Sequence, residues 1–159
     1  MEQYIKIDLN TQCLRLVQQG NTIFESVISS AKNGPGELSG SECTPRGQHI
    51  VRAKIGEGCD VNSVFVGRRP TGEVYTPELG RDYPDRDWIL TRILWLSGMQ
   101  PGFNRLGKVD TMRRYIYIHG TPDEVNMGVA DSHGCIRMCN ADIVTLFDLV
   151  PAGIVVEIA

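Results

Sequence analysis

The stretch Ser132-His133-Gly134-Cys135-Ile136-Arg137 decides which fold and chemistry this chain of 159 residues is expected to have. It places a cysteine directly after a glycine and two residues after a histidine. A thiol is a useful nucleophile at neutral pH only when a neighbouring group activates it, and a histidine brought close by the fold commonly does so. Glycine leaves the sulfur accessible and lets backbone N–H groups face a developing oxyanion. We therefore predict a nucleophilic Cys135, with the N–H groups of Gly134 and Cys135 as oxyanion donors.

A second histidine ends a strand-like run upstream of this stretch. The run Tyr115-Ile116-Tyr117-Ile118 is followed directly by His119-Gly120-Thr121. Gly120 permits a close backbone approach behind the histidine. His119 is therefore a candidate base for the thiol, if the fold brings the two together.

These two segments resemble the signature of the YkuD-type L,D-transpeptidases, whose core is Ser-His-Gly-Cys. The similarity extends to the opening strand and turn at residues 5–12 and to the Thr-Pro-x-Gly turn at residues 44–47. It also covers the closing helix and strand, at residues 140–143 and 151–156. The resemblance thus spans nearly the whole chain. The stretch 68–109 looks like a branch-specific elaboration that could alter the choice of acceptor.

The resemblance assigns roles to the residues of the predicted site. It implies that Cys135 attacks a peptide carbonyl to form a thioester. It makes His119 the general base that activates the thiol and later protonates the leaving amine. The ring would be oriented by the backbone carbonyl of Gly120, so no acidic third residue is needed. His133 matches a histidine of secondary importance and is expected to shape the pocket.

Substrate-binding residues are expected beside this catalytic group. Ser132 should make a local hydrogen bond that fixes the turn. Arg137, two residues after the nucleophile, offers a planar guanidinium that suits a carboxylate. Arg92 is a second candidate for that role. The pairs Arg68-Arg69 and Arg113-Arg114 are expected to lie on the solvated surface.

We expect no metal and no cofactor. His119, His133, Cys135 and Cys139 are the residue types of a Cys₂His₂ zinc site, but the spacing lacks a Cys-x-x-Cys and a His-x₃₋₅-His pair. The Gly34-Pro35-Gly36 loop is not followed by the Gly-Lys-Ser/Thr of a phosphate-binding loop. A noncatalytic or zinc-stabilised peptidoglycan-binding module therefore stays a distant alternative.

Length and charge limit the remaining classes of function. We predict one domain over residues 1–159. The net charge is −3 and no long basic run occurs, so neither nucleic acid nor an anionic membrane is an expected partner. No apolar run approaches the ~20 residues of a membrane span. The five cysteines have no framework spacing and are expected to be reduced thiols. The oligomeric state is not predicted.

The predicted fold is mainly β, a β-sandwich of mixed sheets with one short C-terminal helix. Alternating and β-branched patterns predict strands at residues 4–8, 13–18, 22–29, 49–55, 61–67, 88–96, 115–118 and 154–158. A helix is predicted over 141–150, capped by Asn140 and stopped by Pro151. Residues 68–87 are expected to be a loop, and a helix over 88–96 is the alternative to a strand there.

The resemblance implies a substrate taken from peptidoglycan, either a stem peptide or a muropeptide. The family cleaves the bond between the third residue, a diamino acid, and a terminal D-alanine. The N-terminus shows no secretory signal, so we expect a cytoplasmic L,D-carboxypeptidase that trims tetrapeptide to tripeptide during murein recycling. The alternative is an L,D-transpeptidase that cross-links the third residues of two stems, located in the periplasm if a signal peptide has been removed.

Overall fold

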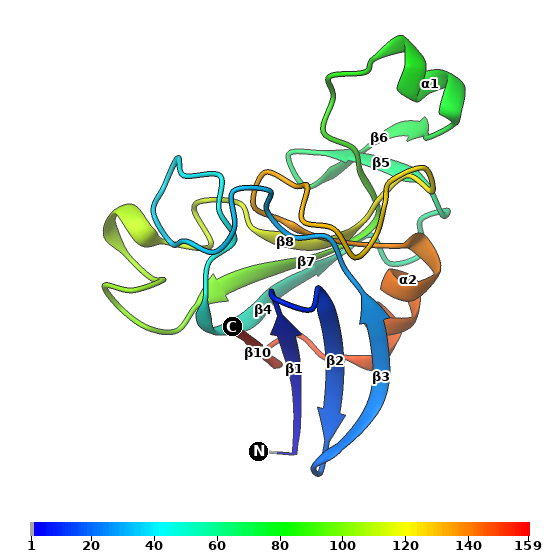
Figure 1. Cartoon of the computed structure of the whole chain (residues 1–159). Coiled ribbons are helices and arrows are strands. Elements are labelled where there is room, and N and C mark those ends of the chain that lie inside the picture. The colour runs from blue at the N-terminus through cyan, green and yellow to red at the C-terminus, as the bar shows by residue number, and fades with distance from the viewer. Residues whose placement is uncertain (1) are drawn as a thin grey trace.

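Ten strands form one continuous hydrogen-bonded sheet, with two short α-helices beside it (Figure 1). The computed structural model describes residues 2–159. The strands are β1 (Gln3–Asp8), β2 (Cys13–Gln18), β3 (Asn21–Val27), β4 (Gly47–Ile55), β5 (Ser63–Val66), β6 (Arg69–Val74), β7 (Ile89–Gly98), β8 (Tyr117–Gly120), β9 (Ile136–Met138) and β10 (Val155–Ile158). The helices are α1 (Pro77–Asp82), α2 (Asn140–Leu149) and the 3₁₀ turn Gly107–Val109. α1 buries no residue, whereas α2 adds Ile143, Leu146 and Phe147 to the core. No helix in residues 2–159 is long and apolar enough to cross a membrane.

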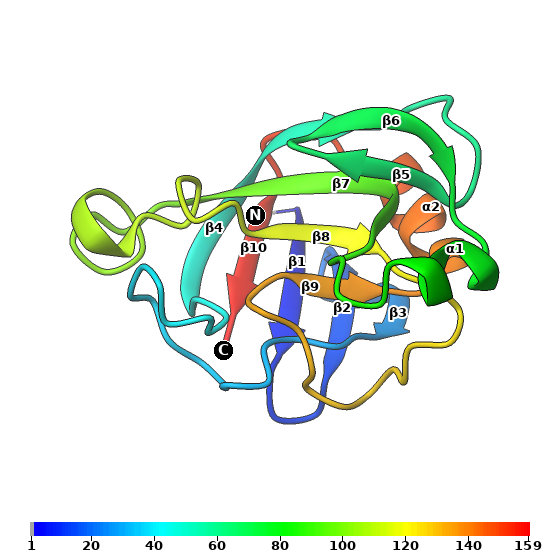
Figure 2. The same ribbon diagram turned by 90° about the horizontal axis from the view of Figure 1, so that it is seen from above.

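The sheet is mixed and branches at β7. Its main path runs β3-β2-β1-β10-β4-β7-β5-β6, and β8 leaves this path by pairing with both β7 and β9. The β1–β10 and β8–β9 pairs are parallel, and the other pairs are antiparallel. The sheet curls back on itself, since the chain after β3 bridges to the β9 region at Ser29–Arg137 and Ala31–Ser132. The predicted mixed β architecture is confirmed, and its packed layers are parts of one curled sheet (Figure 2).

The core lies inside this curl. Ile5 and Leu16 of the first hairpin pack with Val156 of β10, and with Ile118 and Ile136 of β8 and β9. All five side chains are fully buried. Because β8 and β9 carry core side chains on one face, the alternate residues His119 and Arg137 are positioned on the other face, away from this cluster.

The stretch predicted as a loop at residues 68–87 contains two elements. β6 completes a hairpin with β5, and α1 begins after Thr76, whose hydroxyl accepts a hydrogen bond from the Leu79 N–H at 3.1 Å. β6 carries Pro70 and Gly72 and is almost wholly exposed, so it lacks the buried alternation that marks a strand in sequence. The prediction of a loop was wrong here, and α1 is a second helix beyond the single one predicted.

The helix α2 is confirmed, but its N-cap differs from the prediction. The N-cap is Cys139, and no side chain caps the helix there. Asn140 instead uses its side-chain amide to join α2 to β7 and to the turn before β5. Its Oδ1 accepts from the Thr91 hydroxyl at 2.6 Å and its Nδ2 donates to Asn62 Oδ1 at 2.8 Å. Residues 88–96 form a buried strand as predicted, running as β7 from Ile89 to Gly98.

Candidate active site

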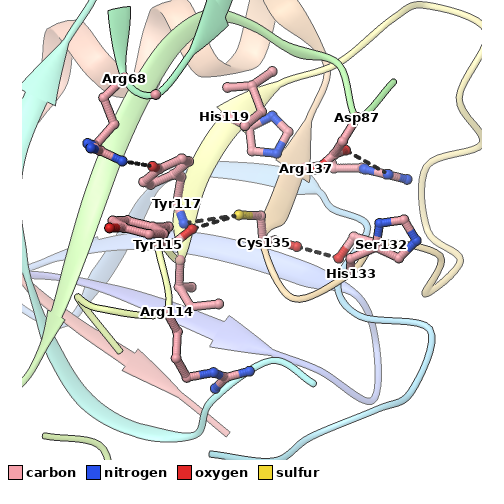
Figure 3. A pocket seen from close by; sticks show the side chains of 13 residues that line it. Arg68, Asp87, Arg114, Tyr115, Tyr117, His119, Ser132, His133, Cys135 and Arg137 are labelled. Atoms are coloured by element: carbon pink, nitrogen blue, oxygen red, sulfur yellow. Dashed lines mark hydrogen bonds and ion pairs between the residues drawn. The ribbon is translucent and has the colours of Figure 1, made fainter. Parts of the chain in front are cut away.

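A cavity of about 410 Å³ opens where β8 and β9 lie side by side (Figure 3). It collects residues from four separate parts of the chain. Its polar and charged lining consists of Arg68, Asp87, Arg114, Tyr115, Tyr117, His119, Ser132, His133, Cys135 and Arg137. Most residues predicted for the site, including both His119 and Cys135, therefore meet in one place.

The thiol of Cys135 sits at the floor of this cavity, just before β9. Its Sγ accepts a hydrogen bond from the Tyr117 N–H at 3.3 Å, and the S–H lies 3.3 Å from the Tyr115 carbonyl oxygen. Burial raises the pKa of the thiol to about 12, against the smaller lowering effect of the Tyr117 N–H. The thiol is therefore protonated at neutral pH before substrate binds.

His119 is fully buried on β8, and its ring points toward the Cys135 sulfur (Figure 3). Its Nδ1 lies 2.6 Å from the Gly120 carbonyl oxygen. A carbonyl oxygen can only accept, so Nδ1 carries the proton and Nε2 has a free lone pair. Nε2 has no hydrogen-bond partner within residues 2–159. Burial lowers the pKa of His119, so the ring is neutral and can accept a proton.

Gly120 is needed at its position for two reasons. Its carbonyl sets the tautomer of His119, as the family resemblance implies. A side chain there would also collide with the Asn140 amide oxygen and approach the Leu90 carbonyl oxygen to 2.6 Å. The close approach expected behind the histidine is thus present, because α2 and β7 press against β8 at this point.

The nucleophile turn is held by a short hydrogen-bond network. The Ser132 hydroxyl donates to the Cys135 carbonyl at 2.6 Å and accepts from the Gly134 N–H at 3.2 Å. The hydrogen bond predicted for Ser132 is therefore present, and it engages the hydroxyl in the turn. Because the Gly134 N–H is already bonded, the Cys135 N–H is the remaining donor of the predicted oxyanion pair.

Thr44 supports this turn from a distant part of the sequence. Its hydroxyl donates to the Gly134 carbonyl at 2.9 Å and accepts from the Ala31 N–H at 2.9 Å. Gly134 has a φ of +136°, which a residue with a side chain rarely adopts. Thr44 and Gly134 together fix the peptide that precedes Cys135.

Replacing Thr44 by Val should destabilise the protein, because it leaves two buried backbone groups without partners. Each unpaired group costs about 1–3 kcal/mol, so we expect the free energy of unfolding to fall by roughly 2–6 kcal/mol. Urea denaturation measures this change. Thr44→Ser is the matched control, since it keeps the hydroxyl. If Thr44→Val has the same free energy of unfolding as Thr44→Ser, the hydrogen bonds of Thr44 do not stabilise the turn.

Arg137 enters the cavity from β9, paired in register with His119 of β8. Its guanidinium lies 3.5 Å from Asp87 Oδ1 and 3.4 Å from the Asp131 carbonyl oxygen. Arg92, the second predicted candidate, does not line this cavity. Its guanidinium donates to the Thr91 carbonyl at 2.7 Å and packs over the Phe147 ring. The structure therefore leaves Arg137 as the predicted carboxylate-binding arginine.

Two arginines expected on the solvated surface also line the cavity. Arg68 donates to the Tyr117 hydroxyl at 3.0 Å and lies 4.6 Å from the centre of the Tyr115 ring. Arg114 donates to the Cys43 carbonyl at 2.6 Å and so ties down the loop before Thr44. For these two the expectation was wrong, because folding packs each guanidinium against residues distant in sequence, whereas Arg69 and Arg113 are exposed as expected.

One signal in the sequence points to part of this lining. Tyr117 and His119 alternate on β8, and alternate residues of a strand share a face. The predicted strand 115–118 begins only at Tyr117, because Tyr115 lies in the preceding turn with a φ of +56°. His133 lies at the rim with its side chain exposed. Among residues 2–159, no group of three or more His, Cys, Asp or Glu side chains could hold a metal ion. The four residues weighed for a zinc site are thus not arranged as one.

Comparisons with known proteins match the chain to one protein family and to solved structures of similar fold. The family model YkuD, the L,D-transpeptidase catalytic domain, matches residues 2–158. No curated protein matches the chain. An L,D-transpeptidase from Enterococcus faecium is 17% identical with a TM-score of 0.61, over 100% of this chain and 50% of that one. One from Mycobacterium smegmatis is 19% identical with a TM-score of 0.60, over 99% and 58%.

A third similar structure is the catalytic domain alone. The NMR structure of the catalytic domain of the E. faecium L,D-transpeptidase acylated by ertapenem is 21% identical with a TM-score of 0.57. The alignment covers 100% of this chain and 98% of that domain. The chain thus spans only about half the length of the longer E. faecium protein, but almost all of the separated domain.

Proposed function

This chain belongs to the YkuD family of L,D-transpeptidase catalytic domains, and we propose that it is an L,D-carboxypeptidase that removes D-alanine from peptidoglycan tetrapeptides. The family acts through a cysteine acyl-enzyme on peptidoglycan peptides. The choice of water as the acceptor is our proposal. The observation that carries this choice is the set of five free thiols, which is typical of a reducing compartment, whereas stems are cross-linked outside the cytoplasm. Arg137 supports the identity of the donor: it is a cation that shares the cavity with Cys135, and within residues 2–159 its guanidinium lies 3.4 Å from the Asp131 carbonyl oxygen and 3.5 Å from Asp87 Oδ1.

The chemistry follows from the neutral pair in the cavity. His119 Nε2 takes the thiol proton as the Cys135 sulfur attacks the carbonyl of the third residue. The carbonyl oxygen becomes an oxyanion facing the Cys135 N–H. When the peptide bond breaks, the protonated ring of His119 gives its proton to the amine of D-alanine. Water then attacks the thioester, and His119 takes its proton. When the carbon–sulfur bond breaks, the ring returns this proton to the Cys135 sulfur, which releases the tripeptide and restores the free enzyme.

Arg137 would bind the carboxylate of the terminal D-alanine. A carboxylate accepts two parallel hydrogen bonds from a guanidinium, and such bonds are usually 2.7–2.9 Å long. The existing contacts of Arg137 are longer than these, so a substrate carboxylate would improve its bonding. A free terminal carboxylate is what distinguishes a tetrapeptide ending in D-alanine from a peptide that continues.

We also propose a reducing compartment, the cytoplasm, as the place of action. All five cysteines are free thiols in the structure. Unpaired thiols are typical of proteins kept in a reducing environment. Trimming of tetrapeptides to tripeptides during murein recycling is the cytoplasmic role that fits such a protein. Measuring whether the labelled protein fractionates with cytoplasmic or periplasmic markers tests the location.

Disaccharide-tetrapeptide is the substrate that tests the choice of acceptor. We expect mass spectrometry to show tripeptide and free D-alanine, with no dimer cross-linked between third residues. Amidation of the terminal carboxylate should slow the reaction, because Arg137 would lose its charged partner. A product mixture dominated by cross-linked dimer would instead assign an L,D-transpeptidase activity.

Arg137→Ala should lower kcat/KM for the free tetrapeptide by about ten- to a hundredfold, the effect of losing a charged hydrogen bond. Arg137→Lys should keep only part of the wild-type kcat/KM, since an ammonium cannot form the two parallel hydrogen bonds of a planar guanidinium. Arg105→Ala is the matched control, because Arg105 is exposed and lies outside the cavity. For the amidated tetrapeptide, kcat/KM of Arg137→Ala should be close to that of the wild type. If Arg137→Ala lowered kcat/KM equally for the free and the amidated tetrapeptide, Arg137 would not recognise the carboxylate.

A further inference from the structure

Asp87 is the one acidic side chain among the residues that line the cavity within residues 2–159. It follows α1 and directly precedes Trp88 and β7. Its carboxylate points toward the guanidinium of Arg137 (Figure 3), and Asp87 Oδ1 lies 3.5 Å from Arg137 Nη2. The side chain of Asp87 is 45% exposed and that of Arg137 is 13% exposed. An internal carboxylate thus stands at the arginine that we assign to the substrate carboxylate.

The contact between these two residues is loose. Charged N–H to carboxylate hydrogen bonds are usually 2.7–2.9 Å long, and this pair is wider. The second contact of Arg137, to the Asp131 carbonyl oxygen, is 3.4 Å. Partly exposed ion pairs contribute little to stability. A carboxylate from the substrate can therefore replace Asp87 on Arg137 at small cost.

The segment that carries Asp87 is fixed on both sides. Before it, Arg86 donates to the Glu73 carboxylate at 2.9 and 3.2 Å and packs over the Trp88 ring at 4.3 Å. The Trp88 ring meets Tyr75 edge to face, and the Tyr75 hydroxyl donates to Glu124 Oε2 at 2.6 Å. Asp87 therefore stays close to Arg137 even when a ligand has displaced its carboxylate, and it can return.

We propose that Asp87 is an internal competitor for the carboxylate site on Arg137. In the free enzyme the Asp87 carboxylate pairs with the Arg137 guanidinium. When the donor peptide binds, its terminal carboxylate replaces that of Asp87. After the peptide bond breaks, Asp87 returns to Arg137 and helps to release D-alanine. Asp87 thus sets the affinity for substrate and product, and contributes no step to the bond-breaking chemistry. This inference rests on the proposed role of Arg137.

The test is protection of Cys135 from iodoacetamide by D-alanine, with D-alaninamide as the probe that lacks a carboxylate. Asp87→Asn should bind D-alanine about two- to fivefold more tightly, the range expected for a partly exposed ion pair. The KM for tetrapeptide should fall by a similar factor. Asp87→Ala should act in the same direction. Asp85→Asn, on the same segment and exposed, removes the same charge and should change neither.

A double substitution separates competition from a structural role. In an Arg137→Ala background, Asp87→Asn should have no effect on protection by D-alanine. A persistent effect there, weaker D-alanine binding in Asp87→Asn, or no protection of any variant would overturn the inference. The protection assay needs no turnover. If tetrapeptide proves not to be hydrolysed while D-alanine still protects in the expected order, only the proposed reaction fails.

Discussion

Cys135→Ala should abolish turnover of tetrapeptide, with kcat falling by about 10⁴- to 10⁶-fold, as expected when the nucleophile of a covalent mechanism is removed. The thioester can form only on the Cys135 sulfur. The other groups of the cavity can only polarise the substrate carbonyl. Discontinuous measurement of released D-alanine gives the rate. Intact-protein mass spectrometry of the wild type should show the tripeptide acyl adduct, and Cys135→Ala should show none.

We expect Cys135→Ala to fold normally, so a loss of activity would reflect the missing thiol and not unfolding. The sulfur of Cys135 makes two hydrogen bonds of 3.3 Å, and the turn around it is held by Ser132 and Thr44 through backbone groups. We expect the urea midpoint to change little. Cys43→Ala and Cys139→Ala are matched controls, since both thiols are partly buried and neither lines the cavity. Activity near wild type in Cys135→Ala would end the covalent mechanism.

The strands of the core could be predicted from the sequence because their alternation reflects burial. Residues 4–8 and 13–18 alternate apolar and polar side chains, and they form β1 and β2. β6 and β9 were missed for different physical reasons. β6 is exposed and carries Pro70 and Gly72, whereas β9 has only three residues and exists through its pairing with β8.

The meeting of Cys135 and His119 in one cavity was predictable, but only part of its surroundings was. Cys135 and His119 stand in short, recognisable segments. Thr44 acts on Gly134 across a separation of 90 residues, and Asp87 meets Arg137 through a segment expected to be a loop. Such contacts depend on how the sheet curls, which no local pattern encodes. The same holds for Arg68 and Arg114, whose positions follow from the aromatic rings and carbonyl groups that the fold brings to them.

His119→Ala should lower kcat/KM by about 10²- to 10⁴-fold, the usual contribution of a positioned general base. The reason is the high pKa of Cys135, about 12, which leaves almost no thiolate at neutral pH without a base. Labelling of Cys135 by iodoacetamide should slow in parallel. His49→Ala is no suitable control, because His49 is buried and bonded to Thr111 at 3.0 Å. His133→Ala is better, since its ring is exposed at the rim, and it should retain most activity.

The pH dependence gives a second measure of the same role. The mechanism needs neutral His119, and burial lowers its pKa below the ordinary value of 6.5. The acid limb of kcat/KM should therefore have its midpoint below pH 6.5, with the rate level through neutrality and falling only as the ring becomes protonated. In His119→Ala this limb should disappear. Added imidazole should restore part of the rate in proportion to its neutral form, because the missing ring leaves space beside the thiol. Full activity without imidazole, or an unchanged acid limb, would show that another group takes the proton from Cys135.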